Sequence, residues 1–94
     1  MSESDRLALL KLDLQIMMTA SDPYLLHLLA AAEEMIRREG IVLTESVEDE
    51  QLRIMYAAYL YRKRAGEDPG MPRMLRWALN NRLLAQKAEA SDAL

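Results

Sequence analysis

The residues that could carry out chemistry are few, and their spacing does not bring them together. His27 is the only histidine and there is no cysteine, so neither a His/Cys metal site nor a histidine-activated thiol can form. The carboxylates occur as neighbours, in Glu33-Glu34 and at 48–50, and neighbouring residues diverge around a helix. We therefore expect surface positions for His27 and for these carboxylates. We also expect no enzymatic activity, no metal and no cofactor.

Five basic residues are concentrated on both sides of a glycine-containing break at 66–70. They are Arg62, Lys63, Arg64, Arg73 and Arg76. Cations at the C-terminal end of a helix complement its dipole and its terminal carbonyls, and this alone can explain why Arg62, Lys63 and Arg64 occur there. The same residues could contact DNA phosphates, so a small helical DNA-binding regulatory protein is the alternative function. The formal net charge of −3 argues against an autonomous DNA-binding protein.

The elements that position these residues are four predicted helices, with no strand. The first is expected over about 5–13, with Ser4 as its N-cap, and an apolar connector follows it. In the second helix Asp22 caps, Pro23 takes the first helical position and Gly40 ends the helix. The apolar arc of the second helix consists of Leu25, Leu28, Leu29, Ala32, Met35 and Ile36.

The third helix begins after a weak capping box at 46–49 and is apolar nearly all round over 52–61. A helix without a polar face is buried on several sides, so this one should be central or shared with a neighbouring subunit. We expect Tyr56 and Tyr59 in the core. Tyr61 points away from them and is a candidate for an interface.

The fourth helix is expected to start at Pro72 and to fade near Ala88. Apolar residues cover well over half of its circumference, which is more than one small core can bury. Trp77 is the best candidate for an interface hot spot. Residues 89–94 lack side chains that pack and are expected to form a flexible tail.

The composition describes one small domain, 1–94, with about 5–88 ordered. Hydrophobic residues make up 51% of the chain, with seven methionines and no phenylalanine, so aliphatic and methionine side chains must form the core. No apolar run approaches about 18 residues, and no signal-peptide pattern occurs. We therefore expect an intracellular protein that does not contact a membrane. The absence of cysteine fits a reducing compartment.

The charge is divided unevenly along the chain. Residues 1–50 carry four basic and eleven acidic side chains, a net charge of −7, whereas residues 51–94 carry eight and four, a net charge of +4. This division suits head-to-tail self-association, although helix-dipole complementation explains it equally well. We expect the third and fourth helices of one subunit to contact the first or second helix of the next. The residues predicted at this interface are Arg62, Arg64, Tyr61, Trp77 and Leu84.

Four segments together resemble a known family of proteins. They are Leu9-Leu10-Lys11-Leu12-Asp13-Leu14, Leu25-Leu26-His27-Leu28-Leu29-Ala30-Ala31-Ala32-Glu33, Met55-Tyr56-Ala57-Ala58-Tyr59-Leu60-Tyr61-Arg62-Lys63-Arg64 and Met71-Pro72-Arg73-Met74-Leu75. With the residues between them, from about Leu7 to Lys87, they resemble the small helical head–tail connector (adaptor, or head-completion) proteins of tailed bacteriophages. The segment at 71–83 is the most distinctive.

The resemblance implies a structural virion protein, a four-helix subunit that forms a ring of about a dozen copies beneath the portal. Such a ring extends the DNA channel, carries DNA only as non-specific cargo, and offers a docking surface for a tail-side stopper or tail-completion protein. The subunit would lie at the head–tail interface of the virion and, during assembly, in the host cytoplasm. Portal contact falls on the C-terminal region, on Arg76, Asn80, Leu83, Lys87 and Leu94.

Overall fold

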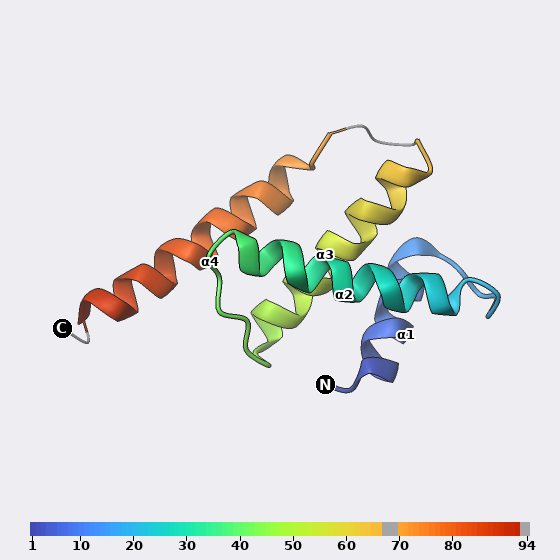
Figure 1. The fold of residues 1–94 in the computed structure, drawn as a ribbon, viewed down its shortest axis with the longest axis horizontal. Helices are drawn as coiled ribbons and strands as arrows, with labels where there is room; N and C mark the ends of the chain where they lie inside the picture. The colour runs from blue at the N-terminus through green and yellow to red at the C-terminus, as the bar shows by residue number, and fades with distance from the viewer. Residues whose placement is uncertain (67–69, 93–94) are drawn as a thin grey trace.

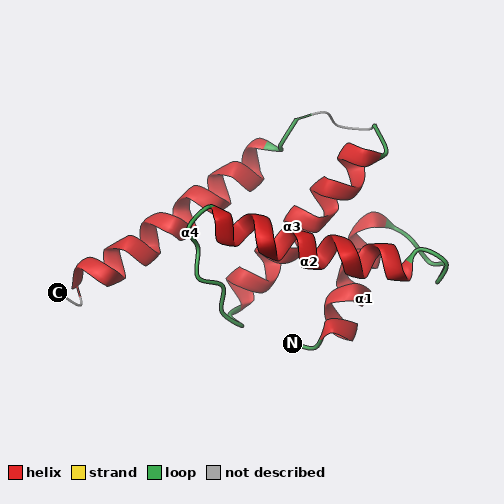
Figure 2. Cartoon of the chain, viewed as in Figure 1, coloured by secondary structure: helices red, strands yellow, loops and turns green. Residues whose placement is uncertain are grey.

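Four helices make up the computed structural model, which describes residues 1–66 and 70–92, with side chains up to Ala90 (Figures 1 and 2). They are α1 (Glu3–Leu14), α2 (Asp22–Arg38), α3 (Val47–Arg64) and α4 (Arg73–Asp92), and the described ranges contain no strand. The all-α prediction is confirmed. α3 packs against all three other helices, so its predicted central position is also confirmed.

α1 begins earlier than the sequence indicated. Its N-cap is Ser2, whose hydroxyl accepts a hydrogen bond from the Asp5 N–H at 3.1 Å, and not Ser4. The acidic Glu3 and Asp5 then occupy the first turn, where they complement the helix dipole. The helix ends when Gln15 adopts a left-handed conformation with φ of 59°. α1 buries Leu10 completely against the other helices.

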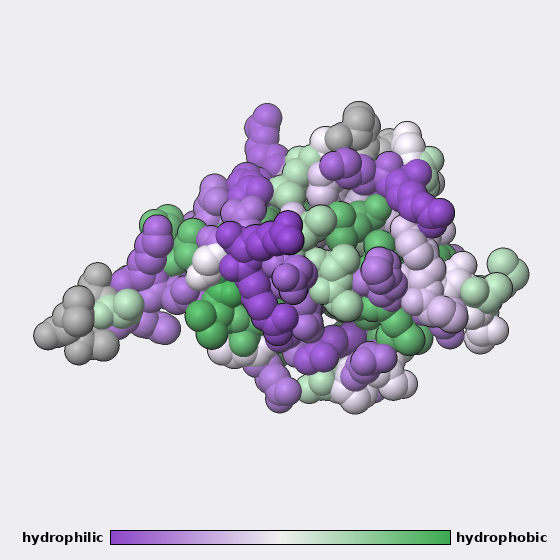
Figure 3. Space-filling model, viewed as in Figure 1, coloured by the Kyte–Doolittle hydropathy of each residue, from purple (hydrophilic) through white to green (hydrophobic). Residues whose placement is uncertain are grey.

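α2 begins at Asp22, with Ser21 as its N-cap, so the predicted cap is already the first helical residue. Its C-terminal turn closes through a hydrogen bond from the Gly40 N–H to the Arg37 carbonyl at 2.9 Å. Gly40 has φ of 98°, a conformation that residues with a Cβ rarely adopt. The predicted arc is buried apart from Met35, which is 37% exposed. On the face seen in Figure 3, hydrophilic side chains lie over α2 and hydrophobic groups flank them.

α3 confirms its predicted cap and core. The Ser46 hydroxyl accepts the Asp49 N–H at 3.1 Å. Tyr56 and Tyr59 are buried and pack edge to face, with ring centroids 5.8 Å apart. The buried apolar side chains of this helix are Leu52, Ile54, Tyr56, Ala57, Ala58 and Tyr59.

The first turns of α3 also hold a buried ion network, so the prediction of solvated carboxylates at 48–50 is wrong for two of them. Asp49 and Glu50 are 0% and 4% exposed, and Arg53 is 5% exposed. Glu50 accepts Arg6 Nε and Nη2 at 2.7 and 2.8 Å, and Arg53 Nη1 at 2.9 Å. Arg53 Nε also donates to Glu33 at 2.9 Å. The bonds from Arg6 and the charge of Arg53 outweigh burial and hold the pKa of Glu50 below its usual range.

α4 runs from Arg73 to Asp92, one residue after its predicted start and beyond its predicted end at Ala88. It therefore includes 89–92 of the expected tail, and residues 93–94 lie outside the described part of the chain. Leu75 and Leu79 are each 1% exposed and form its contact with the core. In Figure 1 the C-terminal turns of α4 extend past the other helices.

Candidate assembly surface

α4 presents a second apolar surface on the side that faces away from the core. Met74, Trp77 and Leu84 are 71%, 67% and 62% exposed. Their spacing of three and seven residues places them along one side of the helix, with Asn81 between Trp77 and Leu84. We call these three side chains the α4 outer face. The predicted excess of apolar circumference on this helix is thus confirmed.

Two arginines hold α4 against the rest of the domain. Arg76 donates to both carboxylate oxygens of Glu39, at 2.9 and 3.1 Å. Arg82 donates in the same way to Asp49, at 2.7 and 3.1 Å. The hydrogen bonds from Arg76 lower the pKa of Glu39. Burial raises the pKa of Asp49, but the hydrogen bonds from Arg82 and Thr44 outweigh it, and the pKa lies below its usual range.

The connector between α2 and α3 is tied to α4 through its backbone. The Gln86 amide accepts the Val42 N–H at 2.7 Å and donates to the Gly40 carbonyl at 2.8 Å. Arg82 Nη2 donates to the Val42 carbonyl at 3.0 Å. These bonds, with the two arginine forks, set the rotation of α4 about its axis. The α4 outer face is therefore displayed on a fixed support.

The other predicted interface residues lie near the C-terminal end of α3 and have contacts within the chain. Arg62 forms an ion pair with Asp13 of α1 at 3.3 Å, with both side chains more than 40% exposed. The Arg64 guanidinium lies 4.6 Å from the centre of the Tyr24 ring. Tyr61 is half-buried against the core. Arg62 borders the α4 outer face, because it lines a pocket together with Met74. Arg64 and Tyr61 line a different pocket, with Tyr24.

The residues predicted to contact a portal divide into two kinds. Asn80 and Lys87 are exposed on α4. Arg76 forms hydrogen bonds with Glu39. Leu83 packs against the core, and its Cδ1 atom lies 3.6 Å from where a Cβ would stand if Gly40 were replaced by a larger residue. Leu94 lies outside the described residues.

The basic residues of the alternative, DNA-binding function are dispersed in the same way. Arg62 and Arg76 are ion-paired within the chain. Lys63 lies 5.8 Å from the centre of the Tyr59 ring, as Arg64 lies over Tyr24. Arg73 is exposed at the start of α4. These contacts leave Arg73 as the most accessible cation of the five.

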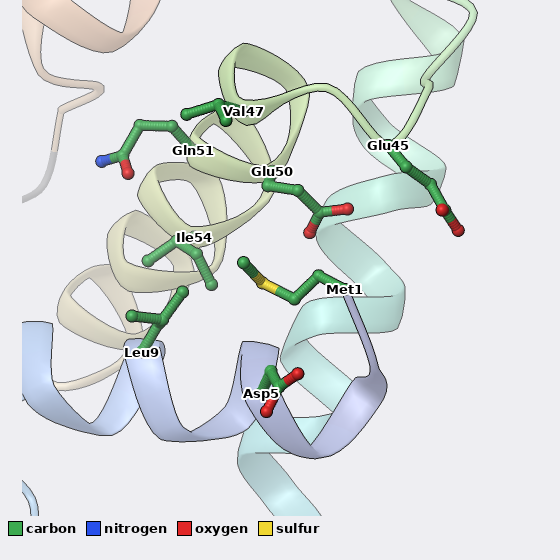
Figure 4. A pocket seen from close by; sticks show the side chains of 8 residues that line it. All are labelled: Met1, Asp5, Leu9, Glu45, Val47, Glu50, Gln51 and Ile54. Carbon is green, nitrogen blue, oxygen red and sulfur yellow. The ribbon is translucent and has the colours of Figure 1, made fainter.

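A pocket of about 430 Å³ lies between the N-terminal parts of α1 and α3 (Figure 4). Its apolar side chains are Met1, Leu9, Val47 and Ile54, and its polar ones are Asp5, Glu45, Glu50 and Gln51. We call it the α1–α3 pocket. Val47, the first residue of α3, is 87% exposed. An apolar residue within the acidic run at 45–50 is the sequence signal of this surface, which we did not predict.

His27 is exposed on α2, as predicted. In residues 1–66 and 70–92 no group of three or more His, Asp or Glu side chains could hold a metal ion. In the same ranges no helix is long and apolar enough to cross a membrane.

These surfaces are an exposed apolar helix face on a fixed support and an apolar pocket with an acidic rim. The head–tail connector family was inferred from the sequence alone. Comparison of the chain with protein-family models, curated proteins and solved structures finds no match, so that resemblance stays a prediction.

Proposed function

We propose that the chain is a structural assembly subunit, the head–tail connector of a tailed bacteriophage, whose copies form a ring beneath the portal. The observation that carries the proposal is the α4 outer face. Met74, Trp77 and Leu84 are each more than 60% exposed on a helix whose rotation Arg76 and Arg82 set. Large apolar side chains displayed in this way, interrupted by Asn81, are the kind of surface that protein partners cover.

The free energy that a partner gains by covering this face can be estimated from Trp77. A tryptophan buries about 150–250 Å², and two-thirds of this side chain is exposed, so a partner could cover roughly 100–170 Å² more. At about 25 cal/mol per Å² this gives roughly 2.5–4 kcal/mol of gross stabilisation. Association itself costs about 4–15 kcal/mol, so Trp77 needs further anchors. Met74 and Leu84 of the same face supply them.

The remaining contacts follow from exposure. Asn80 and Lys87 are exposed on α4 and are available to a portal protein, whereas Leu94 lies outside the described residues. Tyr61, Arg62 and Arg64 supply a second, more polar contact region at the end of α3. A tail-side stopper or tail-completion protein would dock on the assembled ring, and DNA would pass through it without sequence-specific contact.

The mass of the purified chain tests this proposal. Light scattering and electron microscopy, with the protein alone and with a portal ring, should show a closed ring or its addition to the portal. If the chain stays monomeric at every concentration tested and does not bind the portal ring, the proposal is refuted.

The DNA-binding alternative is tested by gel shift. Its one favourable observation is that Lys63, Arg64 and Arg73 are exposed. Nanomolar, sequence-selective duplex binding that survives physiological salt would favour the regulator. Weak binding that disappears with salt would be the non-specific affinity expected of an assembly subunit.

A further inference from the structure

We infer that the α1–α3 pocket of one copy receives the Trp77 side chain of a second copy of the same chain. This inference rests on the proposed function, because it names the two surfaces through which the copies of a connector meet. Neither surface is explained by the fold. Trp77 is outside the core, and the pocket exposes Leu9 and Val47 by 41% and 87%.

The pocket is large enough and apolar enough for an indole ring. Its volume of about 430 Å³ falls within the range of about 300–1,000 Å³ of sites that enclose small organic molecules. Figure 4 shows Leu9 on α1 and Ile54 on α3 turned toward each other, with the Met1 side chain between the helices. Ile54 is 4% exposed and forms a fixed floor, whereas Met1 and Leu9 are partly exposed. An inserted indole would cover them.

Charge complementarity favours this occupant over an unrelated apolar partner. Asp5 and Glu45 lie at the pocket, and neither forms an ion pair within the described residues. Arg73 precedes Trp77 by four residues, so the two side chains lie on the same side of α4. Arg73 is exposed and likewise forms no ion pair within residues 1–66 and 70–92. Insertion of Trp77 would bring Arg73 to the acidic rim. There its charge would set the relative orientation of the two copies and the rate at which they associate.

One copy cannot fill its own pocket. The pocket is lined by α1, α3 and the residues just before them, and by no residue of α4. Figure 1 shows α1 and α4 on opposite sides of α3. Each copy therefore both offers one tryptophan and accepts one. The ring of the proposed function requires these contacts to be heterologous, because two copies that exchanged tryptophans reciprocally would stop at a dimer. Heterologous contacts close into a ring when the rotation between copies permits it.

Two variants separate the halves of this contact. Trp77→Ala removes the inserted side chain, and Val47→Lys places a charged stem in the pocket at a position that is 87% exposed and so leaves the fold intact. Val42→Lys is the matched control, because Val42 is 68% exposed and does not line the pocket. Circular dichroism should show the same helix content in all of them. Truncation of a hot-spot tryptophan should weaken self-association by about 30-fold or more.

Mixing gives the decisive result. Each of Trp77→Ala and Val47→Lys should be monomeric alone at a concentration at which the wild type and Val42→Lys assemble. Together they should form a 1:1 dimer that does not grow, since one intact tryptophan then meets one intact pocket. Trp77 is the only tryptophan in the chain, so in this mixture the tryptophan fluorescence comes from the Val47→Lys variant alone. Its emission should shift to shorter wavelength as the dimer forms.

Three outcomes would overturn the inference. If Val47→Lys assembles like wild type while Trp77→Ala does not, the pocket is not the receiving site, although the proposed function stands. If the two variants stay monomeric when mixed, the contact is not between these surfaces. If the wild type never self-associates but binds a portal ring, a second copy is not the occupant, whereas failure to bind the portal as well would refute the proposed function itself.

Discussion

Replacing Arg82 with methionine should weaken the domain strongly, because Arg82 neutralises the buried Asp49. Methionine keeps most of the apolar stem of Arg82 but removes both hydrogen bonds to Asp49, at 2.7 and 3.1 Å. Asp49 is 0% exposed, so its charge would lose its only guanidinium partner without gaining water.

The magnitude follows from what Asp49 retains. Removing one partner of a buried ion pair typically costs about 3–5 kcal/mol. The Thr44 N–H and hydroxyl still donate to Asp49, at 2.7 and 2.8 Å, and the Arg82 side chain is itself 12% exposed. We therefore expect the lower end, about 3 kcal/mol. A domain of this size has a total stability of about 5–14 kcal/mol, so the loss would be a large share of it.

The effect should depend on pH in a defined direction. The folded pKa of Asp49 is depressed, so its ion pair stabilises the fold above the unfolded pKa, about 4, and this contribution is lost as the pH falls through the folded pKa. In Arg82→Met, burial of Asp49 is opposed only by Thr44. The difference in free energy of unfolding between wild type and variant should be largest at about pH 7. It should shrink as the pH falls toward about 4 and below.

Urea unfolding followed by circular dichroism measures this difference. Arg37→Met is the control, because Arg37 is 57% exposed in its ion pair with Glu33 at 3.4 Å and should change stability by less than about 0.5 kcal/mol. If Arg82→Met lost as little as the control at about pH 7, the ion pair would not stabilise α4 as we argue. A difference that widened in acid would refute the pH argument.

Three further changes test other parts of the structure. Tyr56→Ala should cost about 3 kcal/mol by leaving a cavity in the core, and a loss below about 0.5 kcal/mol in urea would show that the ring is not needed there. Ser46→Ala should cost about 1 kcal/mol through the lost N-cap, and Ser46→Gly should recover most of it if the cap is the reason. Reversing both Arg62 and Arg64 to glutamate should slow assembly and change its salt dependence without unfolding the subunit. Assembly at the wild-type rate in low salt would exclude a charge-paired contact at the end of α3.

The sequence predicted the helices because each carries local signals that tertiary structure did not override. Pro23, Gly40 and Ser46 are near or at the expected helix ends, and the apolar pattern of α3 identified the central element. The start of α1 was misplaced because Ser2 and Ser4 are equally good caps, and only the backbone conformation chooses between them.

Apart from the Glu50–Arg53 pair, the ion network could not be predicted, since its partners are far apart in sequence. Arg6 and Glu50 are separated by 44 residues and Arg82 and Asp49 by 33. The acidic run at the start of α3 already had a local explanation in the helix dipole, and nothing in the run indicates which carboxylates meet an arginine. The candidate surface was predicted in part. The apolar excess of α4 follows from its pattern, but the pocket joins Leu9 to Val47 and requires the packing of α1 on α3.

α4 is apolar on two sides, and this raises the question of which side turns inward. Leu75 and Leu79 face the core, whereas Met74, Trp77 and Leu84 face outward and are each more than 60% exposed. If burial of hydrophobic surface were the only contribution, α4 could also pack after half a turn about its own helix axis, with its outer face turned inward. In that packing Arg82 would point to solvent, and the buried charge of Asp49 would keep only its hydrogen bonds from Thr44. Electrostatics thus favours the observed orientation of α4, and Met74, Trp77 and Leu84 stay on the surface.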